Sequence, residues 1–385
     1  MSLNTVFQNQ SDKTTISTTI KSIIEKAHTP ESIIAAFGGQ QRLQMTLWAL
    51  DSMDLSGPQS ADQYLFRRVK NETAEEASQR LTTLTDSWDK GERPSFPAIA
   101  QAWLKEFGIN EDSNAARTLL LTAARAEMIQ GRPPASAQPA NDEPAYHNRT
   151  HYLQVFQAAC YLLQTQLEFS SQCPKSIEQD RLMSARPSHD DICALLISAM
   201  GHDINHTGCG NPKDPVSQQQ MSFYNEDCAS AAIYPLMEGV YGADAAQAPY
   251  KTVKTFIRFT DPGAAHHDLI KGLECFRSNM PVNPSDNYDI CNEAVFWSHA
   301  AILADSDLLY SCGAGSKANV DNSKKLTAEA KSAGLSLDFT TAAARKYFFD
   351  NIIGVSGFLS APARAVFNDA YQKMRSETEL ELKAA

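Results

Sequence analysis

Helical signals extend over almost the whole chain and constrain its fold more than any other feature. Apolar residues recur at helical intervals over long stretches, and capping residues mark the start of further helices. Alternating strand patterns and Asn-Gly hairpin turns are nearly absent. We therefore predict an all-α protein. Helical periodicity is present in residues 146–168, 192–200, 227–238, 252–259, 292–310, 340–353 and 361–384.

Start signals predict three more helices in the first third of the chain. A proline in the favoured first position opens a segment over 30–48. Thr73 and Glu76 form a capping box that opens a second helix. Asp112 or Ser113 caps a third, rich in alanine and leucine. We expect an exposed loop and several polar breaks at 132–145, 170–190, 207–222, 260–266, 278–290 and 311–324.

Composition restricts the class of partner. With 385 residues, 43% of them hydrophobic, the chain can bury a large core. No window holds the roughly 18 uninterrupted apolar residues of a membrane span, and the polar N-terminus lacks a secretory pattern. Eight scattered cysteines without a CxxC predict a reduced, cytoplasmic chain. A net charge of −11 argues against a nucleic acid polymer, whereas a small anionic substrate is compatible because bound cations invert the local field.

Two pairs of histidines carry the clearest chemical signal. His147 and His151 are four residues apart, so both imidazoles project from one face of a helix. His202 and His206 repeat this spacing at the end of an almost wholly apolar segment, with Asp203 about 100° round the helix. Imidazole and carboxylate together suit Zn²⁺, Mg²⁺ or Mn²⁺. A carboxylate between two such ions suits hydrolysis at phosphorus.

Simpler explanations exist for histidines in general. An i,i+4 pair alone is more often solvated or buried in a core than part of a site. The His-Asp dipeptide at 189–190 lies in a polar linker and is expected to be solvated, and the one at 267–268 has no ligand-like neighbours. Only the dipeptide at 202–203 ends an apolar helix and continues as HDxxHxGxxN. Together with 147–151 it predicts a metal site in a central pocket.

The two motifs together resemble a known family. The match is Tyr146-His147-Asn148-x-x-His151, followed by His202-Asp203-x-x-His206-x-Gly208-x-x-Asn211. It resembles the signature of class I 3′,5′-cyclic nucleotide phosphodiesterases, a branch of the HD-domain metallohydrolases. Shorter matches follow in the family's order at 224–226, 259–261, 303–305 and 357–359. The resemblance implies a compact multi-helix catalytic domain at 95–385, preceded by an N-terminal helical region at 1–94.

Two divalent ions are implied by this resemblance. The implied ligands of the tighter ion, Zn²⁺, are His151, His202, Asp203 and Asp305. Asp203 would also bridge to a more hydrated Mg²⁺ or Mn²⁺. Since the acid at 305 could instead lie on a helix surface, Asp307 is the alternative ligand. Water activated by the ions would attack phosphorus, and His147 would protonate the departing oxygen.

Supporting and substrate-binding roles are also implied by the resemblance. His206 would orient bound water or the ligating groups. Phe358 would stack on the base, although a phenylalanine is more often a core residue. The implied substrate-binding residues are Tyr146, Asn211, Thr260, Val355 and Phe358.

Two positions depart from the family pattern. The family has a glutamate seven residues after the tyrosine of its Tyr-Asn-Asp motif, where this chain has Ala231. Asp227 lies one turn earlier on the same face, and we predict that it substitutes as a catalytic residue. The family's base-reading glutamine is replaced by Val355, which makes no hydrogen bond to a base.

The sequence therefore predicts a metal-dependent phosphodiesterase of a cyclic nucleotide such as cAMP or cGMP. An HD-type phosphohydrolase of another small nucleotide or phosphoester is the first alternative, favoured by Val355. A non-catalytic nucleotide-binding sensor is the second, favoured by Ala231. No particular oligomeric state is predicted.

Overall fold

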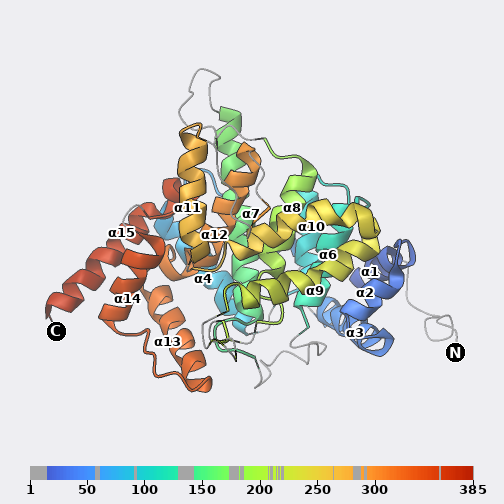
Figure 1. Cartoon of the computed structure of the whole chain (residues 1–385), viewed down its shortest axis with the longest axis horizontal. Coiled ribbons are helices and arrows are strands. Elements are labelled where there is room, and N and C mark those ends of the chain that lie inside the picture. Colours follow the sequence, from blue (N-terminus) through green and yellow to red (C-terminus); the bar gives the residue numbers. More distant parts are fainter. Residues whose placement is uncertain are drawn as a thin grey trace.

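Helices make up the structure of this 385-residue chain, shown in Figure 1 as a computed structural model. The described residues are 15–56, 61–90, 93–128, 143–172, 182, 186–206, 208, 211–213, 215, 217, 221–262, 264–280, 288–289, 293–354 and 357–384. They contain fifteen α-helices and no β-strand, which confirms the predicted all-α class. No helix among them is both long and apolar enough to span a membrane.

The N-terminal part contains α1 (Ile16–Glu25), α2 (Pro30–Ala36), α3 (Gln40–Ser56), the 3-10 turn η2 (Ala61–Tyr64) and α4 (Ala74–Asp89). The prediction of one helix over 30–48 was wrong, because two helices occupy it. Gly38 and Gly39 separate them with φ values of 77° and 102°, which glycine adopts without steric cost. The predicted capping box is confirmed, since Thr73 and Glu76 each accept the other's backbone N–H.

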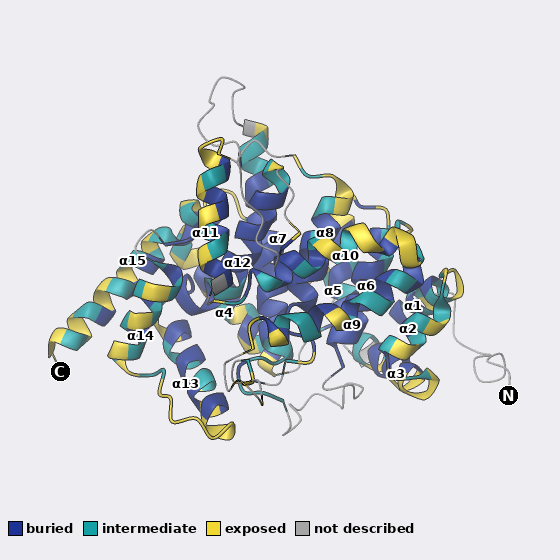
Figure 2. Cartoon of the chain, viewed as in Figure 1, coloured by how far each residue is buried: buried dark blue, intermediate teal, exposed yellow. Residues whose placement is uncertain are grey.

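Three long helices form the centre of the molecule. They are α7 (Arg149–Gln172), α8 (His189–Gly201) and α12 (Ala294–Cys312), and they pack against one another. Figure 2 shows their inner segments as buried. Around them lie α5 (Phe96–Glu106), α6 (Asn114–Ala126), α9 (Tyr224–Tyr241), α10 (Ala243–Arg258), α11 (Ala264–Arg277), α13 (Ser316–Ser332), α14 (Ala342–Phe348), the π-helical turn η3 (Phe349–Ile353) and α15 (Ala361–Ala384).

One helix contradicts the sequence prediction. Residues 311–324, predicted to be a polar break, lie largely in α12 and α13. The buried face of α13 is formed mainly by small and polar side chains, so no apolar periodicity marks it. The dipeptide at 189–190 is exposed, as predicted, and begins α8 rather than lying in a linker. Most of the predicted loop at 132–145 lies outside the described residues.

The N-terminal helices dock on α9. The Thr29 N–H donates to the Gly239 carbonyl at 3.0 Å, and the Ser32 hydroxyl donates to Glu238 Oε2 at 2.9 Å. Ile33 fills the space beside Gly239, where a Cβ would lie 2.3 Å from Ile33 Cγ1. Only glycine permits this approach, so α2 packs closely against α9.

Candidate metal centre

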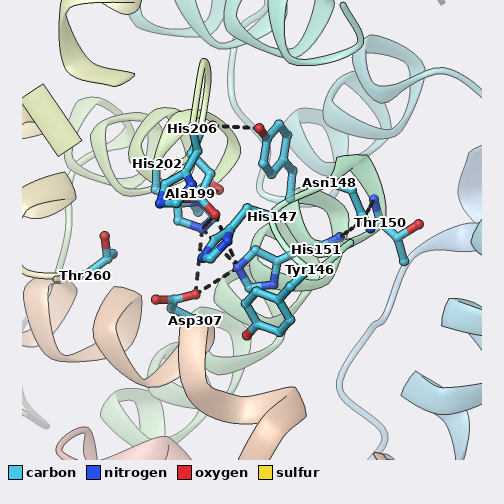
Figure 3. A network of polar contacts seen from close by, with 12 residues as sticks. Tyr146, His147, Asn148, Thr150, His151, Ala199, His202, His206, Thr260 and Asp307 are labelled. Carbon is cyan, nitrogen blue, oxygen red and sulfur yellow. Dashed lines mark hydrogen bonds and ion pairs between the residues drawn. The ribbon is translucent and has the colours of Figure 1, made fainter. Parts of the chain in front are cut away.

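Three side chains from three helices converge in the middle of the fold. His151 lies in the first turn of α7, His202 follows the last residue of α8, and Asp307 lies in α12. His151 Nε2 is 3.0 Å from Asp307 Oδ1 and 3.4 Å from His202 Nε2, and His202 Nε2 is 3.7 Å from Asp307 Oδ1. Figure 3 shows these side chains directed toward one another. We call these three residues the buried cluster.

Asp203 lies beside this group. Its Oδ2 is 3.2 Å from His202 Nε2 and 3.4 Å from His151 Nε2. Burial alone would raise the pKa of Asp203, but the three histidines His202, His206 and His147 hold it well below its usual range. Asp203 is therefore ionised at neutral pH and faces imidazoles from both histidine motifs.

A second group surrounds Asp203 on the other side. His147, Asp203 and His206 each offer a ligand atom within 4.8 Å of the other two, and we call them the outer cluster. The rings of His147 and His206 stack with centroids 3.9 Å apart and planes 18° apart. Each i,i+4 pair thus contributes one histidine to the buried cluster and one to the outer cluster.

Glu329 on α13 orients His147. Its Oε1 lies 2.5 Å from His147 Nδ1, and its Oε2 accepts the backbone N–H groups of Tyr146 and His147 at 2.9 and 3.1 Å. Burial opposes ionisation of this carboxyl, yet the contacts with His147 lower the pKa of Glu329 to about 2. Sequence reasoning missed this residue because the helix that carries it has no apolar pattern.

The two stacked histidines are driven to different protonation states. Burial would lower the pKa of His147, but the charges of Asp203 and Glu329 raise it. Burial and the nearby His147 lower the pKa of His206 to about 4. His147 is therefore the more basic imidazole of the stack, and His206 is neutral at neutral pH.

Local hydrogen bonds aim the imidazoles. The His202 Nδ1 donates to the Ala199 carbonyl at 3.0 Å, which turns Nε2 toward the buried cluster. His206 Nδ1 accepts the Gly208 N–H at 3.0 Å. The Tyr152 hydroxyl donates to the Asp203 carbonyl at 2.6 Å and holds the turn between the two histidines. The first bond directs Nε2 of His202 to the buried cluster, and the second places the proton of the neutral His206 ring on Nε2.

Asp305, predicted as a metal ligand, points elsewhere. Its two carboxylate oxygens accept the backbone N–H groups of Leu359 and Ser360 at 2.9 and 2.6 Å. Burial raises the pKa of Asp305 to about 6. Residues two apart on a helix lie about 200° apart, so only one of the two acids can face the histidines. The structure places Asp307 there, and the expectation for Asp305 is corrected.

Asp227 is also directed away from the clusters. Both of its oxygens accept hydrogen bonds from Arg258 at 2.8 Å, which removes the geometric basis for its predicted role. The neighbouring Glu226 has a buried Oε2 with no hydrogen-bond partner among the described residues. Burial, with Asp261 and Asp203 adding negative charge, raises the pKa of Glu226 to about 7. The sequence signal for Glu226 was the match at 224–226, where it occupies the position of the aspartate in the family's Tyr-Asn-Asp motif.

The predicted substrate-binding residues fall into two groups. Tyr146 lies at the clusters, where its ring is 4.5 Å from that of His151. Figure 3 includes Thr260 in the same view, and its hydroxyl donates to the Ile257 carbonyl at 2.7 Å. Asn211 accepts the Asn225 N–H at 2.9 Å and so holds the start of α9.

The other predicted substrate contacts are less accessible. Phe358 is 2% exposed and packs near Tyr371 and Gly313, so the expected stacking platform is a core residue in this structure. A Cβ on Gly313 would lie 3.2 Å from Phe358 Cζ, which shows how closely the ring is enclosed. Val355 lies outside the described residues.

The donor set fits a divalent cation. Oδ2 of Asp203 is buried without a hydrogen-bond partner among the described residues, although three imidazoles surround its carboxylate. Imidazole nitrogens and carboxylate oxygens from three helices or their ends meet with ligand atoms only 3.0–3.7 Å apart. Zn²⁺ and similar ions bind this combination. The candidate ligands are His151, His202, Asp203 and Asp307.

Comparison with known proteins gives a match for the segment that carries the site. Residues 146–229 match the family model described as 3'5'-cyclic nucleotide phosphodiesterase. No curated protein sequence matches the chain.

Two solved structures are similar at low identity. The phosphodiesterase domain of the RhoPDE fusion protein from the choanoflagellate Salpingoeca rosetta is 15% identical, with 86% of this chain and 98% of that chain covered and a TM-score of 0.46. LmjPDEB1 in complex with IBMX is 14% identical, with 89% and 98% covered and a TM-score of 0.48. These likenesses are weak, so the assignment depends on the sequence match. That match includes all four histidines of the two clusters, so the segment that carries the site is similar to the 3'5'-cyclic nucleotide phosphodiesterase family.

Proposed function

We propose that the protein hydrolyses the phosphodiester of a 3′,5′-cyclic nucleotide, cAMP or cGMP, to the 5′-monophosphate. The observation that carries this proposal is the meeting of two i,i+4 histidine pairs around the buried carboxylate of Asp203. The family match covers the same residues. We also propose a boundary near residue 94 between an N-terminal helical region and the catalytic domain, and a cytoplasmic location supported by the scattered cysteines.

Cation binding is assigned to the buried cluster together with Asp203. We propose Zn²⁺ at His151, His202, Asp203 and Asp307, and Mg²⁺ or Mn²⁺ at a second position shared through Asp203. When bound, two such cations lower the pKa of water enough to provide a nucleophile near neutral pH and stabilise charge at phosphorus. The low pKa of Asp203 keeps its carboxylate ready for a cation.

His147 is proposed as the general acid. Attack by water on phosphorus breaks the bond to the 3′ oxygen, which needs a proton as it leaves. His147 carries that proton because Asp203 and Glu329 raise its pKa. Glu329 Oε1 holds Nδ1 of the ring, so Nε2 is the atom that delivers the proton. His206 stacks on this ring and stays neutral, which limits repulsion in the outer cluster.

Glu226 is proposed in place of Asp227 as the acid that supports the attacking water. Its Oε2 is buried and unpaired among the described residues, and Asp203 acts on it electrostatically. A carboxyl with a pKa near 7 exchanges a proton readily at neutral pH. Asp227 is held by Arg258 instead.

A different small phosphoester is the second candidate substrate. The burial of Phe358 and the absence of a hydrogen-bonding group at Val355 both favour it over a cyclic purine nucleotide. A non-catalytic sensor that only binds nucleotide is disfavoured by the complete set of clustered histidines.

A hydrolysis screen distinguishes these functions. The purified chain is supplied with Zn²⁺ and Mg²⁺ or Mn²⁺ and tested on cAMP, cGMP and a panel of other nucleotides and phosphoesters. We expect 5′-monophosphate from a cyclic nucleotide, and none from His147→Ala or Asp203→Ala. Turnover of another phosphoester alone would favour the second candidate, and binding without product would favour the sensor.

A further inference from the structure

Arg125 joins two parts of the molecule that are far apart in sequence. This residue lies in the last turn of α6 and is 7% exposed. Its Nε donates to the Ala36 carbonyl at 3.0 Å, and its Nη2 donates to Asn205 Oδ1 at 2.8 Å. Ala36 is the last residue of α2, whereas Asn205 lies between Asp203 and His206 in the metal centre.

The environment of Arg125 is costly for a buried cation. Both of its hydrogen bonds go to neutral oxygens, and its Nη1 is buried without a hydrogen-bond partner among the described residues. Burial lowers the pKa of Arg125, and the charge of Arg42 lowers it further. An apolar side chain of similar length would pack here without that desolvation cost. Stability alone therefore does not explain an arginine, whereas a rigid fork that spans two elements does.

Asn205 is the part of the turn that needs a support. Its φ is 66°, a left-handed conformation that asparagine tolerates better than most residues. The His206 N–H donates to the Asp203 carbonyl at 2.8 Å across this residue. Any rotation at Asn205 therefore moves Asp203 relative to His206. Arg125 holds the Asn205 side chain, and Tyr152 holds the Asp203 carbonyl.

The other end of the arginine contact is equally fixed. The carbonyls in the last turn of a helix lack intrahelical partners and carry the negative end of the helix dipole, so the Ala36 carbonyl is a favourable acceptor for a guanidinium. α2 is seated on α9 by the Thr29 and Ser32 hydrogen bonds and by Ile33 against Gly239. The hydrogen bond from Arg125 to the Ala36 carbonyl therefore forms only when α2 is docked on α9.

We infer that Arg125 is a positioning residue through which the docked N-terminal helix α2 sets the geometry of the Asp203–His206 turn, and with it the affinity of the centre for divalent cations. The inference rests on the proposed cation site. The Arg125 side chain acts through Asn205, because its hydrogen bonds among the described residues go to Ala36 and Asn205 rather than to either cluster.

Mn²⁺ titration of the full-length chain, followed by calorimetry, tests this inference. Arg125→Met removes the guanidinium group. Asn205→Gly permits the same left-handed backbone conformation but removes the side-chain amide. Each variant is expected to weaken Mn²⁺ binding about tenfold, as residues behind metal ligands do. The double variant is expected to bind no more weakly than either single one, because both break the same contact. Circular dichroism establishes that each variant is folded.

Arg117→Met is the matched control, because Arg117 lies on the same helix and pairs with the exposed Asp112. Its Mn²⁺ affinity is expected to equal that of the wild type. Ser32→Ala loosens α2 from α9 and is expected to weaken Mn²⁺ binding in the wild-type background but not in Arg125→Met. Wild-type affinity in both Arg125→Met and Asn205→Gly would overturn the inference. A wild-type chain that binds no Mn²⁺ or Zn²⁺ would instead overturn the proposed function.

Discussion

The buried and outer clusters use the same residue types but differ in how they are supported. In the buried cluster, ring nitrogens face each other and Asp307 at 3.0–3.7 Å, from helices packed at the centre of the fold. In the outer cluster, His147 and His206 stack face to face, and Glu329 controls the ring of His147. The comparison teaches that one i,i+4 spacing places the two histidines of each pair in different surroundings: one lies in the buried cluster, which we propose holds a cation, and the other lies in the outer cluster with the proposed general acid.

Asp307→Asn, in the buried cluster, is expected to have the largest effect. Loss of the carboxylate removes an anionic ligand, so we expect loss of tightly bound Zn²⁺ and a fall in kcat of at least about 10⁴-fold. Metal analysis of the purified chain and a turnover assay measure both.

Asp305→Asn is the matched control. It should keep the cation and lower stability by about 1–3 kcal/mol through a lost acceptor for the 359–360 backbone. Loss of the cation in Asp305→Asn but not in Asp307→Asn would show that Asp305 is the ligand.

His147→Gln, in the outer cluster, should lower kcat about 10³-fold without loss of cations. The reason is that the leaving oxygen loses its proton donor while the buried cluster stays intact. A phosphodiester with a p-nitrophenolate leaving group needs no such proton, so its hydrolysis should be affected much less. Equal loss on both substrates, or release of the cation, would assign His147 to cation binding instead.

Glu329→Gln tests the electrostatic control of the outer cluster and should lower kcat about 100-fold at pH 8, by analogy with hydrogen-bond partners that orient metal-ligating histidines. The carboxylate raises the pKa of His147, so its removal lowers that pKa. Because a general acid must be protonated, the alkaline limb of the pH–kcat profile should move to lower pH. An unchanged limb would show that Glu329 has only a structural role. The amide oxygen of the new glutamine can still accept the Tyr146 N–H, so we expect the variant to fold normally.

Glu226→Gln should have the smallest effect of the four catalytic substitutions, about a tenfold loss in kcat. Its control, Asp227→Asn, should change kcat less than about twofold. The first carboxyl is buried and unpaired among the described residues, whereas the second is partly exposed and bound to Arg258. Loss of that exposed ion pair should lower stability by no more than about 1 kcal/mol. A larger kcat loss from Asp227→Asn than from Glu226→Gln would reinstate the original prediction.

Much of this structure was predictable because its signals are local. The Thr73–Glu76 capping box marked the start of α4, and the spacing of His147, His151, His202 and His206 marked the candidate metal centre. Contacts made across the fold carry no such local signal. Glu329 lies on a helix without apolar periodicity, 182 residues after its partner. Choosing between Asp305 and Asp307 required the rotation of α12 about its axis, which sequence spacing does not fix.

Phe358 illustrates a different limit. Its position in the family pattern predicted an accessible ring, but the neighbouring Gly313 leaves room for that ring to be enclosed. Burial depends on which small residues face a side chain from distant segments. Such pairings appear only when the chain is folded.

The distance along the chain between Glu329 and His147 has a consequence for synthesis. A ribosome that has released residues 146–229 has produced every histidine of the centre, but neither Asp307 nor the helix that carries Glu329. The partly synthesised chain therefore holds the four histidines without the carboxylate of Asp307. Glu329, which orients the ring of His147, is not yet present. The proposed activity therefore requires α12 and α13 to have been synthesised and Glu329 to have bonded to Tyr146 and His147.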